Sequence, residues 1–344
     1  MSSAAITPDP SPNDPLLRVR SLVKRFPVRR DVLGRPTSHL EAVAGVDLDV
    51  HTGETVALVG ESGCGKSTLA RLLLRLIEPT AGTVEFDGLD VLHASGRELR
   101  TFRQQAQIIF QDPFGSLDPR FRVLDIVSEG MTHLNLSRSD RRARVAEILE
   151  LVELSSGVLD RYPHEFSGGQ RQRISIARAI AVGPRLVVAD EPVSALDVSV
   201  QSTILNLLSD LQDRLKLTYV FISHDMSVVR HMANRVAVMY LGRIVEMAPA
   251  RDLFDNPQHP YTQALLSSVP SLHRDRESRR IRLVGDVPTA IDPPRACLFA
   301  SRCFRRIDRC TESVPPLEHL PTIERDHTVA CFNPAPVTEL TDVS

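Results

Sequence analysis

The sequence lacks the features that would direct it into a membrane, onto nucleic acid or out of the cell. Its longest apolar stretches, such as residues 69–77, are interrupted by arginines, whereas a membrane-spanning helix needs about 20 apolar residues. Lys and Arg number 41 against 43 Asp and Glu, and the net charge of −2 gives no general attraction to nucleic acid or anionic lipid. Residues 1–15 lack the basic-then-apolar pattern of a signal peptide. We therefore expect a non-secreted, cytoplasmic protein without a transmembrane helix or a nucleic-acid partner.

The length of 344 residues exceeds one typical domain of about 150 residues, so we expect a principal domain and an appendage. Several apolar runs are enriched in Val and Ile, which is typical of strands buried on both faces of a parallel sheet. Helical spacing follows residue 66 and dominates between about 120 and 182, where Ser137 or Ser139 is a suitable N-cap. The pattern predicts an α/β fold with strands at 17–26, 42–50, 55–59, 82–87, 106–110, 185–190 and 218–223.

A phosphate-binding loop is the most specific motif of the chain. The pattern G-x-x-x-x-G-K-[ST] is matched by Gly60, Gly65, Lys66 and Ser67, between a predicted strand and a predicted helix. Its glycines let backbone N–H groups surround a phosphate, Lys66 reaches the β- and γ-phosphates, and the Ser67 hydroxyl ligates Mg²⁺. An ordinary glycine turn is the weaker alternative. The expected nucleotide contacts are Gly60, Glu61, Ser62, Gly63, Cys64, Gly65, Lys66, Ser67 and Thr68.

Charged groups follow two of the predicted buried strands. Asp190 and Glu191 end the strand 185–190, and His224 follows the strand 218–223. Ligands of open α/β sheets bind at this carboxyl edge. We expect Asp190 to assist in holding Mg²⁺, Glu191 to act as the general base for an attacking water, and His224 to bond the γ-phosphate and orient the water. A solvated Asp-Glu-Pro turn and a structural histidine are the alternatives.

A second anion-binding helix start is predicted at Ser167, Gly168, Gly169 and Gln170. Ser167 is a suitable N-cap, and the two glycines leave the N-terminus of the following helix uncovered. With this segment preceded by Phe166, the sequence resembles the ABC-type ATPases, whose signature it reproduces with Phe in place of the usual Leu. The order of the phosphate loop, this signature and the paired acids matches that family as well.

The resemblance implies an ABC cassette fold with a parallel-sheet core, an antiparallel β subdomain and a helical subdomain at about 115–182. It also implies a head-to-tail dimer in which the phosphate loop of one subunit and the signature of the other hold the same ATP. Gln111 corresponds to the family's Q-loop, coupling Mg²⁺ and water to the helical subdomain. Asp197 lies in the D-loop, and Phe26 is the expected adenine-stacking aromatic.

A narrower resemblance, to the dipeptide/oligopeptide importer ATPases, rests on the residues around the phosphate loop and Gln111, on residues 116–120 and on 256–262. Within that family the chain is most similar to the second ATPase of the pair. The resemblance implies two permease subunits, a homologous ATPase as heterodimer partner, an extracytoplasmic solute-binding protein and a peripheral location at the cytoplasmic face of the membrane. The expected divisions are tails at 1–15 and 338–344, an ATPase domain at 16–250 and a C-terminal domain at 251–337.

Alternatives to peptide import remain at this point. Nickel, glutathione and certain oligosaccharides use closely similar ATPases, because the permease and the binding protein choose the cargo. A non-transport ABC ATPase of DNA repair or translation would usually carry two cassettes or a long coiled coil, and a binding module that does not hydrolyse ATP is disfavoured by Glu191 and His224.

Four of the five cysteines lie near the C-terminus, at Cys297, Cys303, Cys310 and Cys331, with the spacing C-x5-C-x6-C-x20-C. A reducing cytosol argues against disulfides, and the spacing does not fit a standard zinc ribbon. Four thiolates are the ligand set of a [4Fe–4S] cluster, which is also what the family resemblance implies. We expect such a cluster with a structural role, with zinc or four unligated thiols as alternatives.

Overall fold

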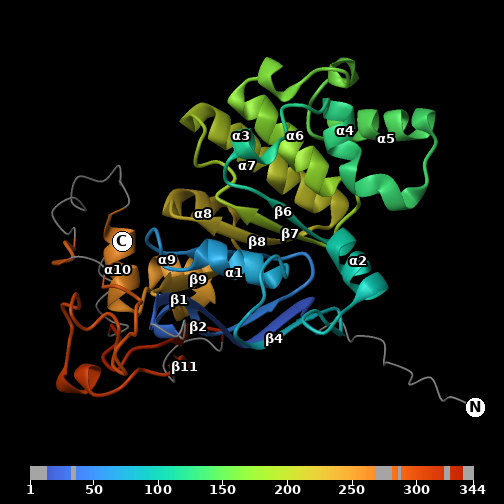
Figure 1. The fold of residues 1–344 in the computed structure, drawn as a ribbon. Coiled ribbons are helices and arrows are strands. Elements are labelled where there is room, and N and C mark those ends of the chain that lie inside the picture. Colours follow the sequence, from blue (N-terminus) through green and yellow to red (C-terminus); the bar gives the residue numbers. More distant parts are fainter. Residues whose placement is uncertain (1–13, 32–35, 269–280, 286–287, 321–325, 336–344) are drawn as a thin grey trace, which may run out of the picture.

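The protein is described by a computed structural model, which covers residues 14–31, 36–268, 281–285, 288–320 and 326–335. Apart from Asp14 and Pro15, both expected tails lie outside these residues. The described chain contains two β-sheets with helices around them (Figure 1).

The larger sheet has the strand order β11-β12-β10-β9-β3-β8-β7-β6. Its centre, from β9 through β3, β8 and β7 to β6, is parallel, as the apolar runs predict. The strands added beyond β9 are antiparallel. The bounds are β3 Thr55–Val59, β6 Ala106–Ile109, β7 Leu186–Asp190, β8 Thr218–Ser223, β9 Arg235–Tyr240, β10 Arg243–Pro249, β11 Glu318–His319 and β12 Thr328–Val329.

The central strands are apolar throughout because each of their faces covers a separate core. Along β7, Val187 and Ala189 pack into the cluster formed with the helices of residues 117–211. Leu186 and Val188 point to the opposite face, into a cluster that contains helix α1, Lys66–Leu73. All five residues of β7 are buried. This arrangement holds the carboxyl ends of the central strands rigidly in line.

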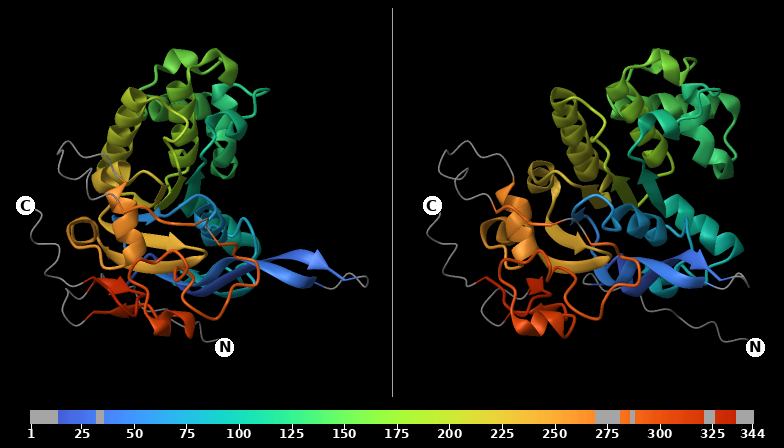
Figure 2. Two further views of the ribbon diagram at one scale, coloured as in Figure 1. Left: turned by 90° about the vertical axis from the view of Figure 1, so that its left-hand side faces the viewer. Right: turned by 60° about the vertical axis from the view of Figure 1, so that its left-hand side comes forward.

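The second sheet is antiparallel and has the order β2-β1-β4-β5, with bounds β1 Leu17–Arg30, β2 Pro36–Val50, β4 Ala81–Phe86 and β5 Leu89–Asp90. The predicted strand ends at residues 26 and 42 are wrong, since the pairing of β1 with β2 continues to Arg30 and Pro36. This extension forms a two-stranded ribbon (Figure 2). Phe26 and Val28 on it are 36% and 47% exposed, so no buried face imposes the alternation from which a strand is recognised.

The helices α3 to α6 lie together beyond β6 and β7, at the top of Figure 1. Ser137 is the N-cap of α5, and its Oγ accepts a hydrogen bond from the Asp140 N–H at 3.1 Å, which confirms one of the two predicted caps. Ser167 caps α6 in the same way. The helices are α1 Lys66–Leu73, α2 Gly96–Gln105, α3 Pro113–Ser116, α4 Val123–Ser128, α5 Arg138–Leu151, α6 Gly168–Ile180, α7 Val198–Leu215, α8 Met226–Met232, α9 Ala250–Asp255 and α10 Pro260–Ser267, with 3₁₀ turns η1 Glu129–Leu134, η2 Ser156–Val158, η3 Pro163–Glu165 and η5 Asp308–Thr311.

The C-terminal part, meaning the described residues after 250, packs directly on the larger sheet (Figure 2). Strand β12 pairs with β10, and β11 pairs with β12. Tyr261 and Phe299 are buried with Tyr240 of β9 in one aromatic cluster, with ring centroids 4.7 to 5.5 Å apart. His327 is anchored to the fully buried Glu246 of β10 by a 2.7 Å hydrogen bond. The C-terminal part therefore shares its core with the larger sheet.

In the ranges that the structure describes, no helix has both the length and the apolarity needed to cross a membrane.

Candidate functional site

The predicted phosphate loop runs from the end of β3 into α1. Gly60 and Gly65 have φ angles of 154° and 107°, in the region that favours glycine. A Cβ atom at Gly60 would lie 2.2 Å from the Met239 carbonyl oxygen, and one at Gly65 would lie 2.1 Å from that of Ala42. Both glycines are required because neighbouring backbone leaves no room for a side chain.

Lys66 and Ser67 begin α1 at the closed end of the loop. Lys66 is 5% exposed. Its ammonium group donates to the carbonyl oxygens of Gly60 at 2.7 Å and Glu61 at 3.0 Å. The Ser67 hydroxyl donates to Asp190 Oδ1 at 2.9 Å. Burial raises the pKa of the Asp190 carboxyl, and the Ser67 hydrogen bond opposes that rise. Oxygen donors of this kind are the ligands that Mg²⁺ prefers.

Glu191 lies directly after β7 and is held from two sides. Gln111 Nε2, after β6, donates to Glu191 Oε2 at 2.9 Å, and His224 Nδ1, after β8, lies 3.2 Å from the same oxygen. Glu191 has a φ of 46°, an unfavourable value for a residue with a side chain, and such strain concentrates at functional sites. The three polar side chains therefore meet at the carboxyl edge of adjacent parallel strands, the edge at which Glu191 and His224 were expected.

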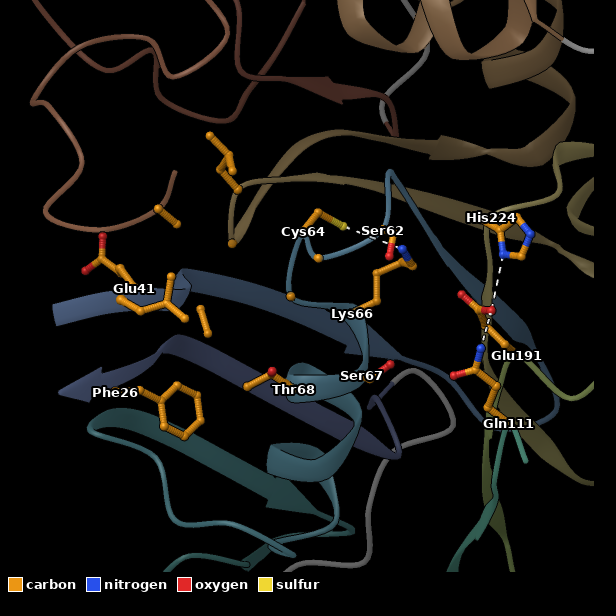
Figure 3. Close-up of a pocket in the computed structure, with 17 residues that line it drawn as sticks. Phe26, Glu41, Ser62, Cys64, Lys66, Ser67, Thr68, Gln111, Glu191 and His224 are labelled. Carbon is orange, nitrogen blue, oxygen red and sulfur yellow. Dashed lines mark hydrogen bonds and ion pairs between the residues drawn. The ribbon is translucent and has the colours of Figure 1, made fainter. Parts of the chain in front are cut away.

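A cavity of about 570 Å³ joins this cluster to the phosphate loop. Figure 3 shows Phe26 and Glu41 at one end and Gln111, Glu191 and His224 at the other, with Lys66 and Ser67 between them. Of the expected nucleotide contacts, Ser62, Gly63, Cys64, Gly65, Lys66, Ser67, Thr68 and Phe26 line the cavity. Gly60 and Glu61 do not line it and instead support the loop through their carbonyl oxygens.

Sequence reasoning missed part of the cavity wall. Leu40 and Glu41 of β2 line the cavity beside Ala290, and the Glu41 N–H donates to the Ala290 carbonyl oxygen at 2.9 Å. Leu40 and Ile291 form an isolated antiparallel bridge. No motif in residues 288–292 signals this contact, because it depends on where the C-terminal part folds back on the ribbon.

The signature residues and Asp197 lie outside this cavity. Ser167 begins α6, where its Oγ accepts from the Gln170 N–H at 3.4 Å and its N–H donates to Gln170 Oε1 at 3.1 Å. Gly168 and Gly169 form the first turn, and a Cβ atom at Gly169 would lie 2.6 Å from Val200 Cγ1. Asp197 begins α7. The N-terminus of α6 is thus a second helix start, separate from the cavity that the phosphate loop lines.

The predicted four-cysteine metal site receives no support from the structure. Cys297, Cys303, Cys310 and Cys331 lie within electrostatic range of one another, and burial raises the pKa of the Cys331 thiol to about 12. However, the described residues contain no group of three or more Cys, His, Asp or Glu side chains placed to hold a metal ion. Cys310 lies in η5 and the other three cysteines lie in irregular segments. The Cys297 N–H donates to the Cys310 carbonyl oxygen at 3.0 Å.

The fold and the site together define an ATPase of the ATP-binding cassette class. Residues 43–194 match the family model described as ABC transporter, and residues 245–310 match the model described as oligopeptide/dipeptide transporter, C-terminal region. A dimeric ATP-binding cassette bound to ADP and phosphate is 29% identical, with a TM-score of 0.61, and the match covers 68% of this chain and 99% of that one. The cassette cbiO1 of Clostridium perfringens is 28% identical, with a TM-score of 0.60 and coverage of 71% and 92%.

The chain belongs to the ATP-binding proteins of the dipeptide/oligopeptide importer family. It is 47% identical over 326 residues to the dipeptide transport ATP-binding protein DppF of Haemophilus influenzae, covering 93% of this chain and 97% of that protein. It is 46% identical over 320 residues to the oligopeptide transport ATP-binding protein AppF of Bacillus subtilis, covering 92% and 96%. The resemblance predicted from the motifs is confirmed.

Proposed function

We propose that this chain hydrolyses ATP to power the import of di- and oligopeptides through partner permease subunits. The observation that carries the proposal is the meeting of Gln111, Glu191 and His224 opposite Lys66 and Ser67 in one cavity. Lys66 and the loop N–H groups bind the phosphates, and Phe26 stacks on adenine. Ser67, Gln111 and Asp190 would hold Mg²⁺, which stabilises the charge that develops on the phosphates.

The Glu191 carboxylate serves as the general base in this proposal. It takes a proton from the water that attacks the γ-phosphate, while Gln111 fixes its orientation. His224, bonded to the same carboxylate oxygen, orients the water and the γ-phosphate. The cluster can do this because its three members come from the ends of three adjacent strands, so their spacing is fixed by the sheet.

The complete site requires a second ATPase subunit. Ser167, Gly168, Gly169 and Gln170 form a helix start away from the cavity, and in a head-to-tail dimer they bind the nucleotide held by the partner's phosphate loop, with Asp197 near the subunit boundary. This chain pairs with a homologous ATPase as a heterodimer, and the assembly also contains two permease subunits and an extracytoplasmic solute-binding protein. The chain lies peripherally at the cytoplasmic face of the membrane. It is divided into an ATPase domain at residues 16–250 and a C-terminal domain at 251–337.

Transport assays test the cargo. Deleting the gene should abolish uptake of labelled di- and oligopeptides; the wild-type gene should restore it, and a Lys66→Ala gene should not, because the loop cation is needed for ATP binding. Unchanged peptide uptake combined with loss of nickel, glutathione or oligosaccharide uptake would contradict the peptide assignment and leave the ATPase assignment standing. Co-purification of the chain should recover two permeases and a different ATPase.

The [4Fe–4S] cluster stays a proposal that rests on the donor set of four thiols and on the family resemblance. Anaerobically purified protein should carry about four irons per chain and absorb broadly near ~400 nm. Protein in which Cys310 and Cys331 are both replaced by Ser should lose the iron. Stoichiometric zinc, or no metal after anaerobic handling, would contradict the cluster.

A further inference from the structure

The C-terminal part contacts the phosphate loop at Glu61, the residue after Gly60. Arg302 Nη1 lies 2.8 Å from Glu61 Oε2, and Arg302 Nη2 lies 3.0 Å from Glu61 Oε1. The two parallel hydrogen bonds form a bidentate ion pair, the strong and geometrically specific form of this contact. The Arg302 side chain is 8% exposed and the Glu61 side chain 26% exposed, so water screens the pair only partly.

Arg302 is itself held in place by the aromatic cluster. Its Nη1 lies 3.5 Å from the Tyr240 hydroxyl, and its guanidinium carbon lies 6.0 Å from the centroid of the Tyr240 ring. Phe299, three residues earlier, is buried against the same ring. The cation therefore sits on a packed surface, and the entropy of fixing a long side chain is lost on folding rather than on nucleotide binding.

A second C-terminal residue grips the same loop position. The Glu61 N–H donates to the Tyr261 hydroxyl at 2.8 Å, and Tyr261 is completely buried. The Glu61 carbonyl oxygen accepts from Lys66 Nζ at 3.0 Å. All three polar groups of Glu61 are thus engaged, two of them by the C-terminal part and one by the lysine that reaches into the nucleotide cavity.

We propose that Arg302 is a positioning residue for nucleotide binding, which orients the phosphate loop through Glu61 and neutralises the charge of that carboxylate within the loop. The proposal rests on the assignment of the cavity as the ATP site. Glu61 belongs to the loop that surrounds the phosphates, so its uncompensated negative charge would repel them. Arg302 removes that repulsion and, with Tyr261, fixes the backbone that carries the Lys66 contact.

The C-terminal part therefore acts on ATP affinity within the same chain. Arg302→Gln should weaken ATP binding to the full-length chain by about tenfold, equivalent to about 1.4 kcal/mol, and should raise the KM for ATP in the assembled transporter while leaving kcat near wild type. Binding of adenosine, which has no phosphates, should be unchanged. Arg302→Lys should keep most of the affinity for ATP because it keeps the positive charge. It should remain somewhat weaker than wild type because lysine cannot form the bidentate contact.

A double-mutant cycle separates this role from simple support of the fold. Glu61→Gln alone should weaken ATP binding by less than about threefold, because a neutral amide does not repel phosphates. Glu61→Gln combined with Arg302→Gln should bind ATP like Glu61→Gln, since the charge that Arg302 neutralises is gone. If Arg302 only stabilised the C-terminal part, the double variant would bind as weakly as Arg302→Gln or more weakly.

Titration calorimetry with ATP and with adenosine measures these affinities. Mg²⁺ is left out so that ATP is not hydrolysed during the titration. Arg306→Gln, an exposed arginine four residues away, is the matched control and should bind ATP normally. Lys66→Ala tests the site itself. Normal ATP binding by Lys66→Ala would refute the cavity assignment, whereas loss in Lys66→Ala with normal affinity and KM in Arg302→Gln would refute only the role of Arg302. An equal loss of ATP and adenosine binding in Arg302→Gln would also overturn the proposal.

Discussion

Replacing Glu191 by Gln gives the most direct test of the catalytic assignment. The amide is nearly the same size as the carboxylate, and its oxygen can still accept the hydrogen bond that Gln111 Nε2 donates to Glu191 at 2.9 Å. The amide cannot take a proton from water. The substitution therefore removes the base while leaving the shape of the cavity and the phosphate loop unchanged.

The expected loss in turnover is about 10²–10⁴-fold, the usual contribution of a positioned general base. This corresponds to about 3–5 kcal/mol in the activation barrier. ATP affinity should be close to wild type, because the expected phosphate contacts come from the loop residues 62–68 that line the cavity. Since hydrolysis is blocked after binding, the variant should accumulate as an ATP-bound closed dimer.

Phosphate release by the complete transporter measures the turnover, and size-exclusion chromatography with and without ATP measures the closed dimer. Lys66→Ala is the control for contaminating ATPases, since its residual rate sets the background. Turnover of Glu191→Gln within about threefold of wild type would refute the assignment of Glu191 as the base. Loss of both ATP binding and turnover would instead show that Glu191 acts on the geometry of the cavity.

Three further predictions concern the metal-binding carboxylate, the signature and the C-terminal anchor. Burial raises the pKa of Asp190, so the folded state loses stability as pH rises through that pKa and the carboxyl becomes charged. Asp190→Asn should therefore raise the melting temperature of the nucleotide-free protein at pH 7, with a smaller gain toward pH 4, and should lose the Mg²⁺-dependent stabilisation by ATP. A variant that is less stable than wild type at pH 7 would contradict this. Ser167→Arg should abolish ATP hydrolysis in the assembly and leave ATP binding to the isolated chain intact, whereas Ser137→Arg, which removes the equivalent cap of α5, should keep its activity; normal hydrolysis by Ser167→Arg would argue against a shared site. His327→Ala leaves the fully buried Glu246 without one of its hydrogen-bond donors and should lower the free energy of unfolding by about 1–3 kcal/mol. An unchanged denaturant midpoint would contradict this prediction.

Asp190, Glu191 and His224 could be placed at one edge of the sheet because each ends or follows a strand whose burial is visible in the sequence. Residues 185–190 and 218–223 are apolar runs followed by Asp190, Glu191 and His224, and parallel pairing brings those ends together. The pairing of residues 27–30 with 36–39 was not predicted, since exposed residues such as Val28 impose no alternation on the sequence. The four cysteines suggested a cluster by residue type alone, but the described residues contain no group of three or more Cys, His, Asp or Glu side chains placed to hold a metal ion.

The sequence by itself determined the α/β fold, the phosphate loop, the acids and the ATPase family, because these depend on local motifs and on burial patterns that repeat along the chain. Only the tertiary structure decided that the C-terminal part extends the larger sheet and reaches the nucleotide site. Arg302 and Glu61 are 241 residues apart, and Leu40 meets Ile291 by a single bridge. Neither contact follows from periodicity or spacing, since each requires two distant surfaces to fold against one another.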